Sequence, residues 1–145
     1  MKTAYRVPDT PHASVKPGET GFKTVPISRM VPRSFFTNVT ADTVVKPGAP
    51  VPVRGLAFGG IAASPRSSCQ RMAARPGGRR ISAATKAPYS FRRWQAQVTA
   101  PAPGTMTLMA RCTNTSGVSQ PAEPNWNANG FMRNVIETVR LAVVA

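Results

Sequence analysis

Acidic residues, histidine and cysteine are scarce in this chain of 145 residues. It contains five Asp or Glu, one histidine and two cysteines. Cys69 and Cys112 do not have the spacing of metal ligands, and two cysteines do not make a disulfide framework. His12 alone completes neither a metal site nor a Ser-His-Asp triad, so we interpret it as a surface residue. The composition therefore argues against a metal centre or a histidine-based active site within this chain.

Long apolar runs are also missing. No stretch approaches the roughly 18–20 apolar residues that a helix needs to span a bilayer, so we expect no membrane span. The N-terminus, MKTAYRVPDTPH, lacks the apolar centre of a signal peptide. Met1 is followed at once by sequence typical of the interior of a domain, which favours the interpretation that this chain is a fragment of a longer protein.

Proline, glycine and basic residues, in contrast, are abundant. Fifteen prolines and eleven glycines favour short strands and turns over long helices. Residues 1–35 are proline-rich and weakly patterned, and we expect an extended segment with turns at Pro8–Pro11 and Lys16–Gly18. Nineteen Lys or Arg give a net charge of +14, which is typical of a protein with an anionic partner such as nucleic acid.

Short strand patterns recur from residue 34 to the end of the chain. The clearest is TMTLMARCT, residues 105–113, in which Met106, Leu108, Ala110 and Cys112 share one face. We therefore expect Cys112 to be a buried core residue rather than a reactive thiol. The other expected strands are SFFTNVT (34–40), DTVV (42–45), VPVRGLAFGG (51–60), YSFRRWQAQV (89–98) and VIETVRLAVV (135–144). Several short strands without an amphipathic helix predict an all-β sandwich.

A spaced set of residues in the C-terminal half is recognisable. The strand that contains Trp94 is followed by APAPG, LMARCT and the turn TSG. After them come the remaining residues of the set, which are Gln120, Pro121, Trp126, Asn127, Gly130 and Asn134. This pattern resembles the C-terminal dimerisation domain of the molybdenum-dependent sulfite oxidase family. Upstream, TAYRVPDTP and RMVPRSFFTN resemble the end of the cofactor domain of bacterial sulfite dehydrogenases, and the resemblance covers nearly the whole chain except residues 61–87.

The resemblance implies a fold and an activity. Residues 36–145 would form an immunoglobulin-like β-sandwich, and residues 1–35 would be the C-terminal remnant of a molybdopterin-binding domain. The parent enzyme would oxidise sulfite to sulfate at a molybdenum pyranopterin and pass the electrons one at a time to a c-type cytochrome in the periplasm. This part of it would serve dimerisation and close the anion pocket. Nitrate reductases carry a similar domain, and the YRVPDTP segment favours sulfite.

The metal-binding cysteine motif of the family is not present in this sequence. We therefore expect the fragment to bind no molybdenum cofactor and to be inactive alone, whereas the parent would form a homodimer or bind a cytochrome c subunit. The family places an arginine on its last strand near the substrate pocket, and Arg140 is the best match by position. A guanidinium suits an oxyanion such as sulfite, and the alternative is a surface arginine on an edge strand.

Other conspicuous side chains have simpler interpretations. We expect Arg92, Arg93 and Arg111 to lie on solvated strand faces or in interface ion pairs. We expect Trp126 to be a structural plug in its loop rather than a platform for a ligand.

Residues 61–87 break both the strand pattern and the resemblance. The segment reads IAASPRSSCQRMAARPGGRRISAATKA and contains six basic residues, no acidic residue and no aromatic residue. The family has a strand, a turn and a second strand here, of the form V-x-V-S-x-D-G-G-x-x-W. Back-translation with G/C-rich codons, read in the shifted frame, permits CGVAPVELSADGGATWRPADLGGDEG. Met72 has a single codon, and with Ala73 it must give the first glycine of the Asp-Gly-Gly turn.

We interpret residues 61–87 as a reading-frame slip, with one base lost near Gly60 and one gained near Pro88. The corrected segment would contain one basic and five acidic residues, so the net charge of the chain would fall from +14 to +4. We therefore expect no nucleic-acid partner. The alternatives are a solvated basic loop and a nucleic-acid-binding arm, which would lack aromatics for base stacking. Two other functions stay open for the whole chain: a stand-alone immunoglobulin-like binding module and a basic nucleic-acid-binding protein.

The slip also has predicted consequences for folding. As written, residues 61–87 should be irregular, because Pro65 and Pro76 would interrupt a strand ladder. The strands on either side should keep unpaired edges, and the chain should be marginally stable and prone to aggregation.

Overall fold

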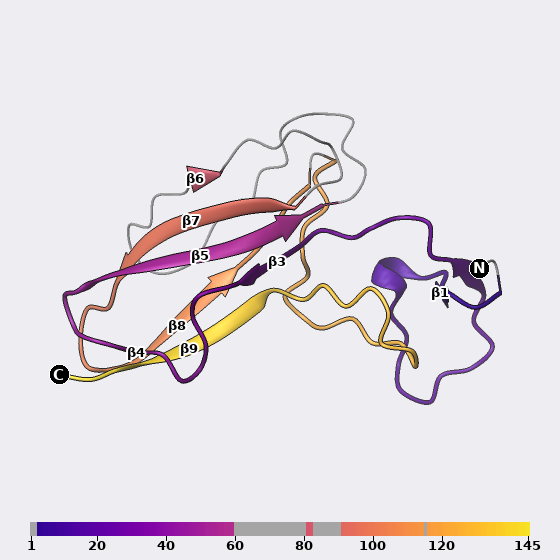
Figure 1. Cartoon of the computed structure of the whole chain (residues 1–145). Helices are drawn as coiled ribbons and strands as arrows, with labels where there is room; N and C mark the ends of the chain where they lie inside the picture. The colour runs from indigo at the N-terminus through magenta and orange to yellow at the C-terminus, as the bar shows by residue number, and fades with distance from the viewer. Residues whose placement is uncertain (1–2, 60–80, 83–90, 115) are drawn as a thin grey trace.

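The computed structural model describes residues 3–59, 81–82, 91–114 and 116–145. Figure 1 shows that the regular secondary structure of this part of the chain is almost all β-strand, joined by long connecting segments. The elements are, in order, β1 (Arg6–Pro8), the 3-10 helix η1 (Pro11–Ala13), β2 (Thr24–Pro26), β3 (Arg33–Phe36), β4 (Val44–Val45), β5 (Pro50–Phe58), β6 (Ile81–Ser82), β7 (Arg92–Thr99), β8 (Gly104–Ala110) and β9 (Glu137–Val143). The predicted all-β sandwich is confirmed. No helix in the described residues is long and apolar enough to cross a membrane.

Strand β5 is central in a four-stranded sheet with the order β3-β5-β7-β6. It pairs antiparallel with β3 on one side and with β7 on the other. The register places Gly55 opposite both Phe36 of β3 and Trp94 of β7. Alternate residues of β5 face inward, and Val53 is fully buried, as the sequence pattern predicts.

Two expectations about the surroundings of residues 61–87 need correction. The sequence predicts unpaired edges on the flanking strands, and this is wrong for β5, which pairs on both sides. In the described part of the chain β7 pairs with β6 only at Trp94 and Gln95, so most of its other edge has no strand partner there. The sequence also predicts irregular chain at Ile81–Ser82, whereas this segment pairs with Gln95 and Trp94 of β7. The edge of β7 offers backbone hydrogen-bonding groups to which even a two-residue segment without proline can add. The rest of residues 61–87 lies outside the described residues.

Strand β9 is the centre of a three-stranded sheet with the order β4-β9-β8. β8 and β9 are antiparallel, with Leu108 opposite Val139, whereas β4 runs parallel to β9. Leu108 and Leu141 are fully buried, as the alternation along their strands predicts. Cys112, just beyond β8, is 1% exposed, so its predicted place in the core is confirmed.

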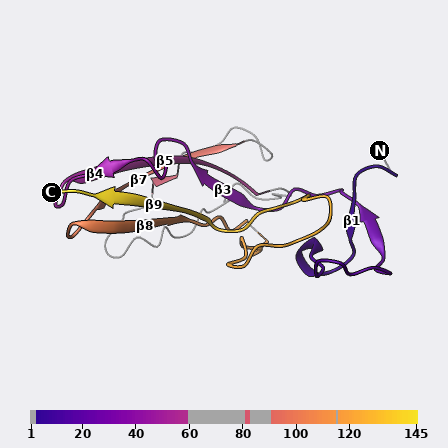
Figure 2. The same cartoon turned by 90° about the horizontal axis from the view of Figure 1, so that it is seen from below.

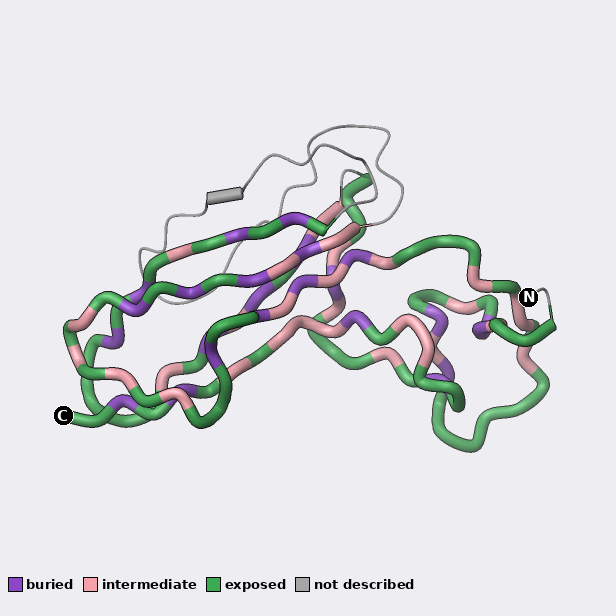
Figure 3. Tube along the Cα trace, viewed as in Figure 1, coloured by how far each residue is buried: buried purple, intermediate pink, exposed green. Residues whose placement is uncertain are grey.

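The hydrophobic core lies between the inner faces of these two sheets, which Figure 2 shows stacked on each other. Figure 3 shows how buried and exposed residues alternate along the chain in β5 and β7. The core cluster contains Phe36, Val39, Val51, Val53, Ala57, Trp94, Val98, Leu108, Ala110, Cys112 and Leu141. Both sheets contribute to it, so burial of apolar surface is the main force that holds them together.

The N-terminal residues form a smaller unit beside one end of the sandwich (Figure 1). β1 and β2 pair antiparallel, with Val7 opposite Val25. The turn predicted at Lys16–Gly18 is confirmed, because the Glu19 N–H donates to the Lys16 carbonyl oxygen (3.1 Å) and Gly18 has a φ of 81°. Hydrogen bonds join this unit to the long loop between β8 and β9.

Candidate functional site

The loop between β8 and β9 is held by the side chain of Gln120, which is fully buried. Its Oε1 accepts a hydrogen bond from the Cys112 N–H (2.7 Å). Its Nε2 donates to the carbonyl oxygens of Asn134 (3.0 Å) and Val135 (2.9 Å). One side-chain amide therefore satisfies three backbone groups where the chain leaves β8 and approaches β9. A neutral group with both donors and an acceptor suits this position, because a buried backbone group without a partner is costly.

Asn127, which is also buried, closes the far part of the same loop. Its Oδ1 accepts from the Phe131 N–H (3.1 Å), and its Nδ2 donates to the carbonyl oxygens of Phe131 (2.9 Å) and Ala13 (3.2 Å). Gly130 completes the turn with a φ of 64°, and its N–H donates to the Asn127 carbonyl oxygen (2.9 Å). Glycine suits this position because other side chains disfavour the left-handed backbone conformation. The bond to Ala13 joins the loop to η1.

Asn134 makes a second connection to the N-terminal part of the chain. Its side chain is 2% exposed, and its Nδ2 donates to the carbonyl oxygen of Pro32 (3.2 Å), just before β3. Gln120, Asn127 and Asn134, which the sequence pattern groups by spacing, thus all hold backbone carbonyl oxygens around one loop. We call these three side chains the amide network.

Sequence reasoning misses Asn125, which supports the amide network. Its Oδ1 accepts from the Asn134 N–H (3.3 Å), and its Nδ2 donates to the carbonyl oxygens of Met132 (3.1 Å) and His12 (3.3 Å). His12 and Met132 both have a φ of 57°, a conformation that costs free energy for residues other than glycine. The available signal is the density of asparagines in residues 125–134, since asparagine favours local bonds to the backbone.

Trp126 holds the N-terminal residues through its backbone rather than its ring. Its N–H donates to Ser14 Oγ (3.0 Å), and its carbonyl oxygen accepts from the Val15 N–H (2.9 Å). The residue is 41% exposed, so the predicted structural plug is wrong. The loop presents its backbone to the N-terminal unit, which leaves much of the ring accessible to solvent. Pro121 also acts through its backbone, because its carbonyl oxygen accepts from the Ile136 N–H (3.0 Å).

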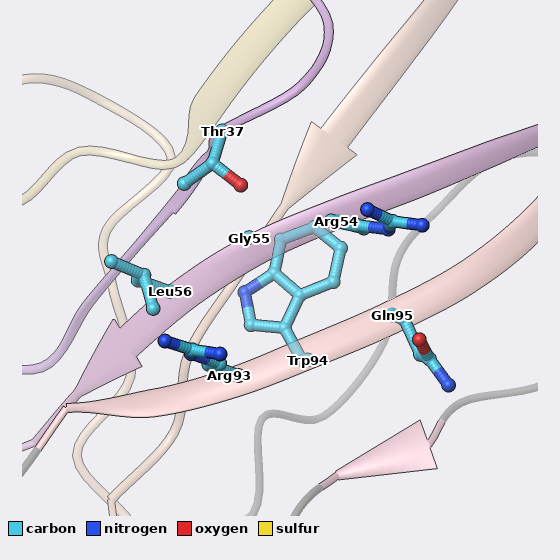
Figure 4. Close-up of a pocket in the computed structure, with 7 residues that line it drawn as sticks. All are labelled: Thr37, Arg54, Gly55, Leu56, Arg93, Trp94 and Gln95. Atoms are coloured by element: carbon cyan, nitrogen blue, oxygen red, sulfur yellow. The ribbon is translucent and has the colours of Figure 1, made fainter.

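Trp94 belongs to the core of the sandwich and not to the amide network. It is 7% exposed and meets Phe36 edge to face, with 5.5 Å between ring centroids. Figure 4 shows the indole lying across β5 at Gly55. Its Nε1 has no hydrogen-bond partner among the described residues. Trp94 therefore contributes to packing between the sheets.

The candidate arginines come from different strands and differ in exposure. Arg140 is exposed on β9, opposite Thr107 of β8, and in the described part of the chain it makes no hydrogen bond to the amide network. β4 pairs with β9 only at Ala142 and Val143, so among the described residues Arg140 has a strand partner on the β8 side alone. Arg93 and Arg111 are exposed, as predicted. Arg92 is 8% exposed, so its predicted place on a solvated face is wrong. It is two residues before Trp94 on β7, and alternate residues of a strand point to the same face, so Arg92 faces inward with the core residues.

No metal-binding constellation occurs among the described residues, which contain no group of three or more His, Cys, Asp or Glu that could hold a metal ion. The amide network is neutral and already hydrogen-bonded, so its chemistry is structural. It fastens the N-terminal residues to the loop between β8 and β9. Comparison with protein-family models and with curated proteins finds no match for this chain.

Proposed function

We propose that this chain is the C-terminal part of a molybdenum-dependent sulfite dehydrogenase. The observation that carries the proposal is the pair of hydrogen bonds from Asn127 and Asn134 to the carbonyl oxygens of Ala13 and Pro32. Both asparagines belong to the pattern that resembles the family's dimerisation domain. Both acceptors lie in the segment that resembles the end of its cofactor domain. The residues that carry the resemblance are thus the ones that join the two segments.

The strand order supports an immunoglobulin-like sandwich whose first strand, β3, begins at Arg33, just before the expected boundary at residue 36. The order β3-β5-β7-β6 follows the order A-B-E-D of such sandwiches, and β8 and β9 correspond to strands F and G. In the immunoglobulin fold, strand C comes between strands B and D along the chain, and β5 and β6 are the counterparts of B and D here. The frame-corrected sequence supplies the strand-like VAPVELS at this place, which supports the frame slip.

In the parent enzyme, this part serves dimerisation and closes the anion pocket of the molybdopterin-binding domain. A molybdenum pyranopterin held by that domain supplies the two-electron oxidation of sulfite to sulfate, and a c-type cytochrome in the periplasm receives the electrons. The fragment itself holds no cofactor. Arg140 is the substrate-binding residue that this part contributes, because an exposed guanidinium on β9 can reach an oxyanion held by a neighbouring domain.

Sequencing the genomic DNA through codons 55–90 and the region upstream tests the proposal. We expect a frame that encodes the Asp-Gly-Gly turn and continues upstream into a molybdopterin-binding domain. A read that confirms the present frame and finds a stop codon just before Met1 would contradict the proposal.

The full-length protein expressed from the corrected frame should contain stoichiometric molybdenum and reduce cytochrome c with sulfite. The matched control is the chain of 145 residues, which should bind no molybdenum and oxidise no sulfite. Stoichiometric molybdenum in this control would show that the chain of 145 residues contains a metal site, which would contradict the proposal. Nitrate is the second substrate in the assay, and activity with nitrate alone would move the assignment to the nitrate reductases.

Arg140→Gln in the full-length enzyme tests the substrate-binding role. The KM for sulfite should rise by about tenfold or more with molybdenum content unchanged, because a charged donor to the anion is lost. Arg111→Gln is the control, since Arg111 is also exposed and follows the neighbouring strand β8. An unchanged KM in both variants would leave Arg140 with no role in substrate binding.

A further inference from the structure

A groove of about 570 Å³ lies on the four-stranded sheet, in a different part of the molecule from the amide network. Strand β5 contributes Arg54 and Leu56 to its walls, and β7 contributes Arg93 and Gln95, as Figure 4 shows. Thr37, just after β3, completes the rim. The volume is in the range of small-ligand sites in proteins.

The strand register places four of the described lining residues on the outer face of the sheet, whereas Gly55 and Trp94 line the groove from buried positions; the four are Arg54, Leu56, Arg93 and Gln95. Gly55 and Trp94 are directly opposite each other and belong to the buried positions of β5 and β7. Their neighbours Arg54 and Arg93 therefore point away from the core, and both are exposed. Arg54 lies opposite Gln95, two positions after Arg93, so the two arginines are diagonal neighbours. Their Cβ atoms should be roughly 7 Å apart. Figure 4 shows their guanidinium groups on opposite sides of the Trp94 indole, so both side chains must turn toward each other to hold one ligand.

The backbone of Arg54 is anchored through both its N–H and its carbonyl oxygen on the side that faces β3. The Arg54 N–H donates to Asn38 Oδ1 (2.6 Å), and its carbonyl oxygen accepts from the Thr37 N–H (2.9 Å). Asn38 Nδ2 also donates to the Pro52 carbonyl oxygen (2.8 Å). The side chain of Asn38 thus continues the bonding to β5 after β3 has ended. A guanidinium on such a backbone loses less conformational freedom when it binds a ligand.

Acidic residues are absent from the strands that form the groove. β3, β5 and β7 contain four arginines and no Asp or Glu. Among the described residues, neither Arg54 nor Arg93 makes a hydrogen bond or ion pair through its guanidinium. The lining residues that the structure describes lie outside residues 61–87, so they are the same in either reading frame. The groove therefore presents two cationic donors without an internal counter-ion in the sheet.

We propose that this groove binds an oxyanion group, such as phosphate or sulfate, between Arg54 and Arg93. Each forked guanidinium offers parallel N–H donors to two oxygens, and the side chains of Thr37 and Gln95 add neutral donors. Leu56 contributes an apolar wall, so an oxyanion carried on an apolar body binds more tightly than the free ion. The site does not depend on the function proposed for the parent enzyme.

NMR titration of the ¹⁵N-labelled 145-residue chain with inorganic phosphate tests the groove, at constant pH and ionic strength. We expect saturable shifts of the Gly55 and Gln95 amides and of the Arg54 side-chain N–H. Phenyl phosphate should saturate the same signals at a lower concentration. The reference titration uses sodium chloride at equal ionic strength. Shifts that stay linear with phosphate and match those in chloride would overturn the proposal.

The double variant Arg54→Gln/Arg93→Gln should weaken phosphate binding by about tenfold or more, because both charged donors are removed. Arg111→Gln, an exposed arginine outside the groove, is the matched control and should keep the original affinity. An equal loss of phosphate affinity in the control would show that phosphate is attracted only by the net charge of the chain, and this would overturn the proposed site. If circular dichroism shows that the double variant is unfolded, Arg54→Lys and Arg93→Lys replace it. A lysine keeps the positive charge but lacks the parallel N–H donors of the guanidinium. Unchanged phosphate affinity in both lysine variants would also overturn the proposal.

Discussion

A side chain on residue 55 would need the space that the indole of Trp94 fills. A Cβ atom on Gly55 would overlap Trp94 Cζ2 and the carbonyl oxygen of Phe35. Gly55 and Trp94 are cross-strand partners, so the glycine of β5 and the tryptophan of β7 form one packing unit. Glycine weakens the interior of most strands, and here the ring laid across it restores the lost contacts.

Gly55→Ala should therefore lower the free energy of unfolding by about 1–3 kcal/mol, because the new methyl group forces the ring or the backbone to move. Denaturant unfolding measures the change. Gln97→Ala, an exposed position on β7, is the control and should stay within about 0.5 kcal/mol of the original chain. The double variant Gly55→Ala/Trp94→Leu should lose less free energy of unfolding than the two single variants lose in sum. If the two losses simply add, the packing unit does not exist.

Gln120→Leu should destabilise the chain by about 3 kcal/mol or more. The change leaves the Cys112 N–H and the carbonyl oxygens of Asn134 and Val135 without their partner. Thermal and denaturant unfolding measure it, with the exposed change Gln97→Leu as control. A loss no larger than that of the control would mean that Gln120 does not hold the loop.

Gln120→Glu should be more stable at low pH than at high pH. An ionised carboxylate would face the two carbonyl oxygens that now accept from Gln120 Nε2, so the folded state would favour the protonated acid. A group that holds its proton more tightly when folded loses stability as pH rises. Unfolding of the variant and of the original chain at a series of pH values measures the difference, which should widen with pH. A constant difference would contradict the geometry of the amide network.

Asn127→Asp should loosen the N-terminal unit, because a carboxylate cannot donate to the carbonyl oxygens of Ala13 and Phe131. Hydrogen exchange of residues 3–31 should become faster while that of β5 and β7 stays unchanged. Asn129→Asp makes the same change of charge at an exposed neighbour and is the control. Equal exchange in both variants would mean that Asn127 does not fasten this unit.

Replacing residues 61–87 with the frame-corrected segment should raise the melting temperature and the solubility of the chain. The corrected segment brings apolar strand residues and five acids, where the present one brings six bases. A Gly/Ser linker of the same length is the control, because it removes the bases without adding a strand. If the chain as written already melts cooperatively at high temperature and the corrected one is no better, the frame slip is wrong.

Local patterns in the sequence predict the strands and the inward faces well. The alternation from Met106 to Cys112 predicts burial correctly, because the side chains of a strand alternate between its two faces. The same rule, applied along β7 from Trp94, would have placed Arg92 inside. Its charge led to the opposite expectation, and the register of the sheet decided its position.

The partners of the amide network were beyond the reach of local patterns. Resemblance groups Gln120, Asn127 and Asn134, but it does not reveal that Asn127 meets Ala13 or that Asn134 meets Pro32. These contacts join positions about a hundred residues apart in the chain. Asn125 was missed for the same reason, because its role depends on where the chain at His12 lies.

The sequence by itself determined that this protein is built from short strands and turns, because proline, glycine and two-residue alternation act on neighbouring residues. It also determined the excess of basic charge and the shortage of metal ligands. Only the tertiary structure decided that Trp94 covers Gly55, that the asparagines hold the N-terminal unit, and that Arg54 and Arg93 flank one groove. Those relationships depend on strand register and loop docking, which are set when segments distant along the chain bury their apolar faces together.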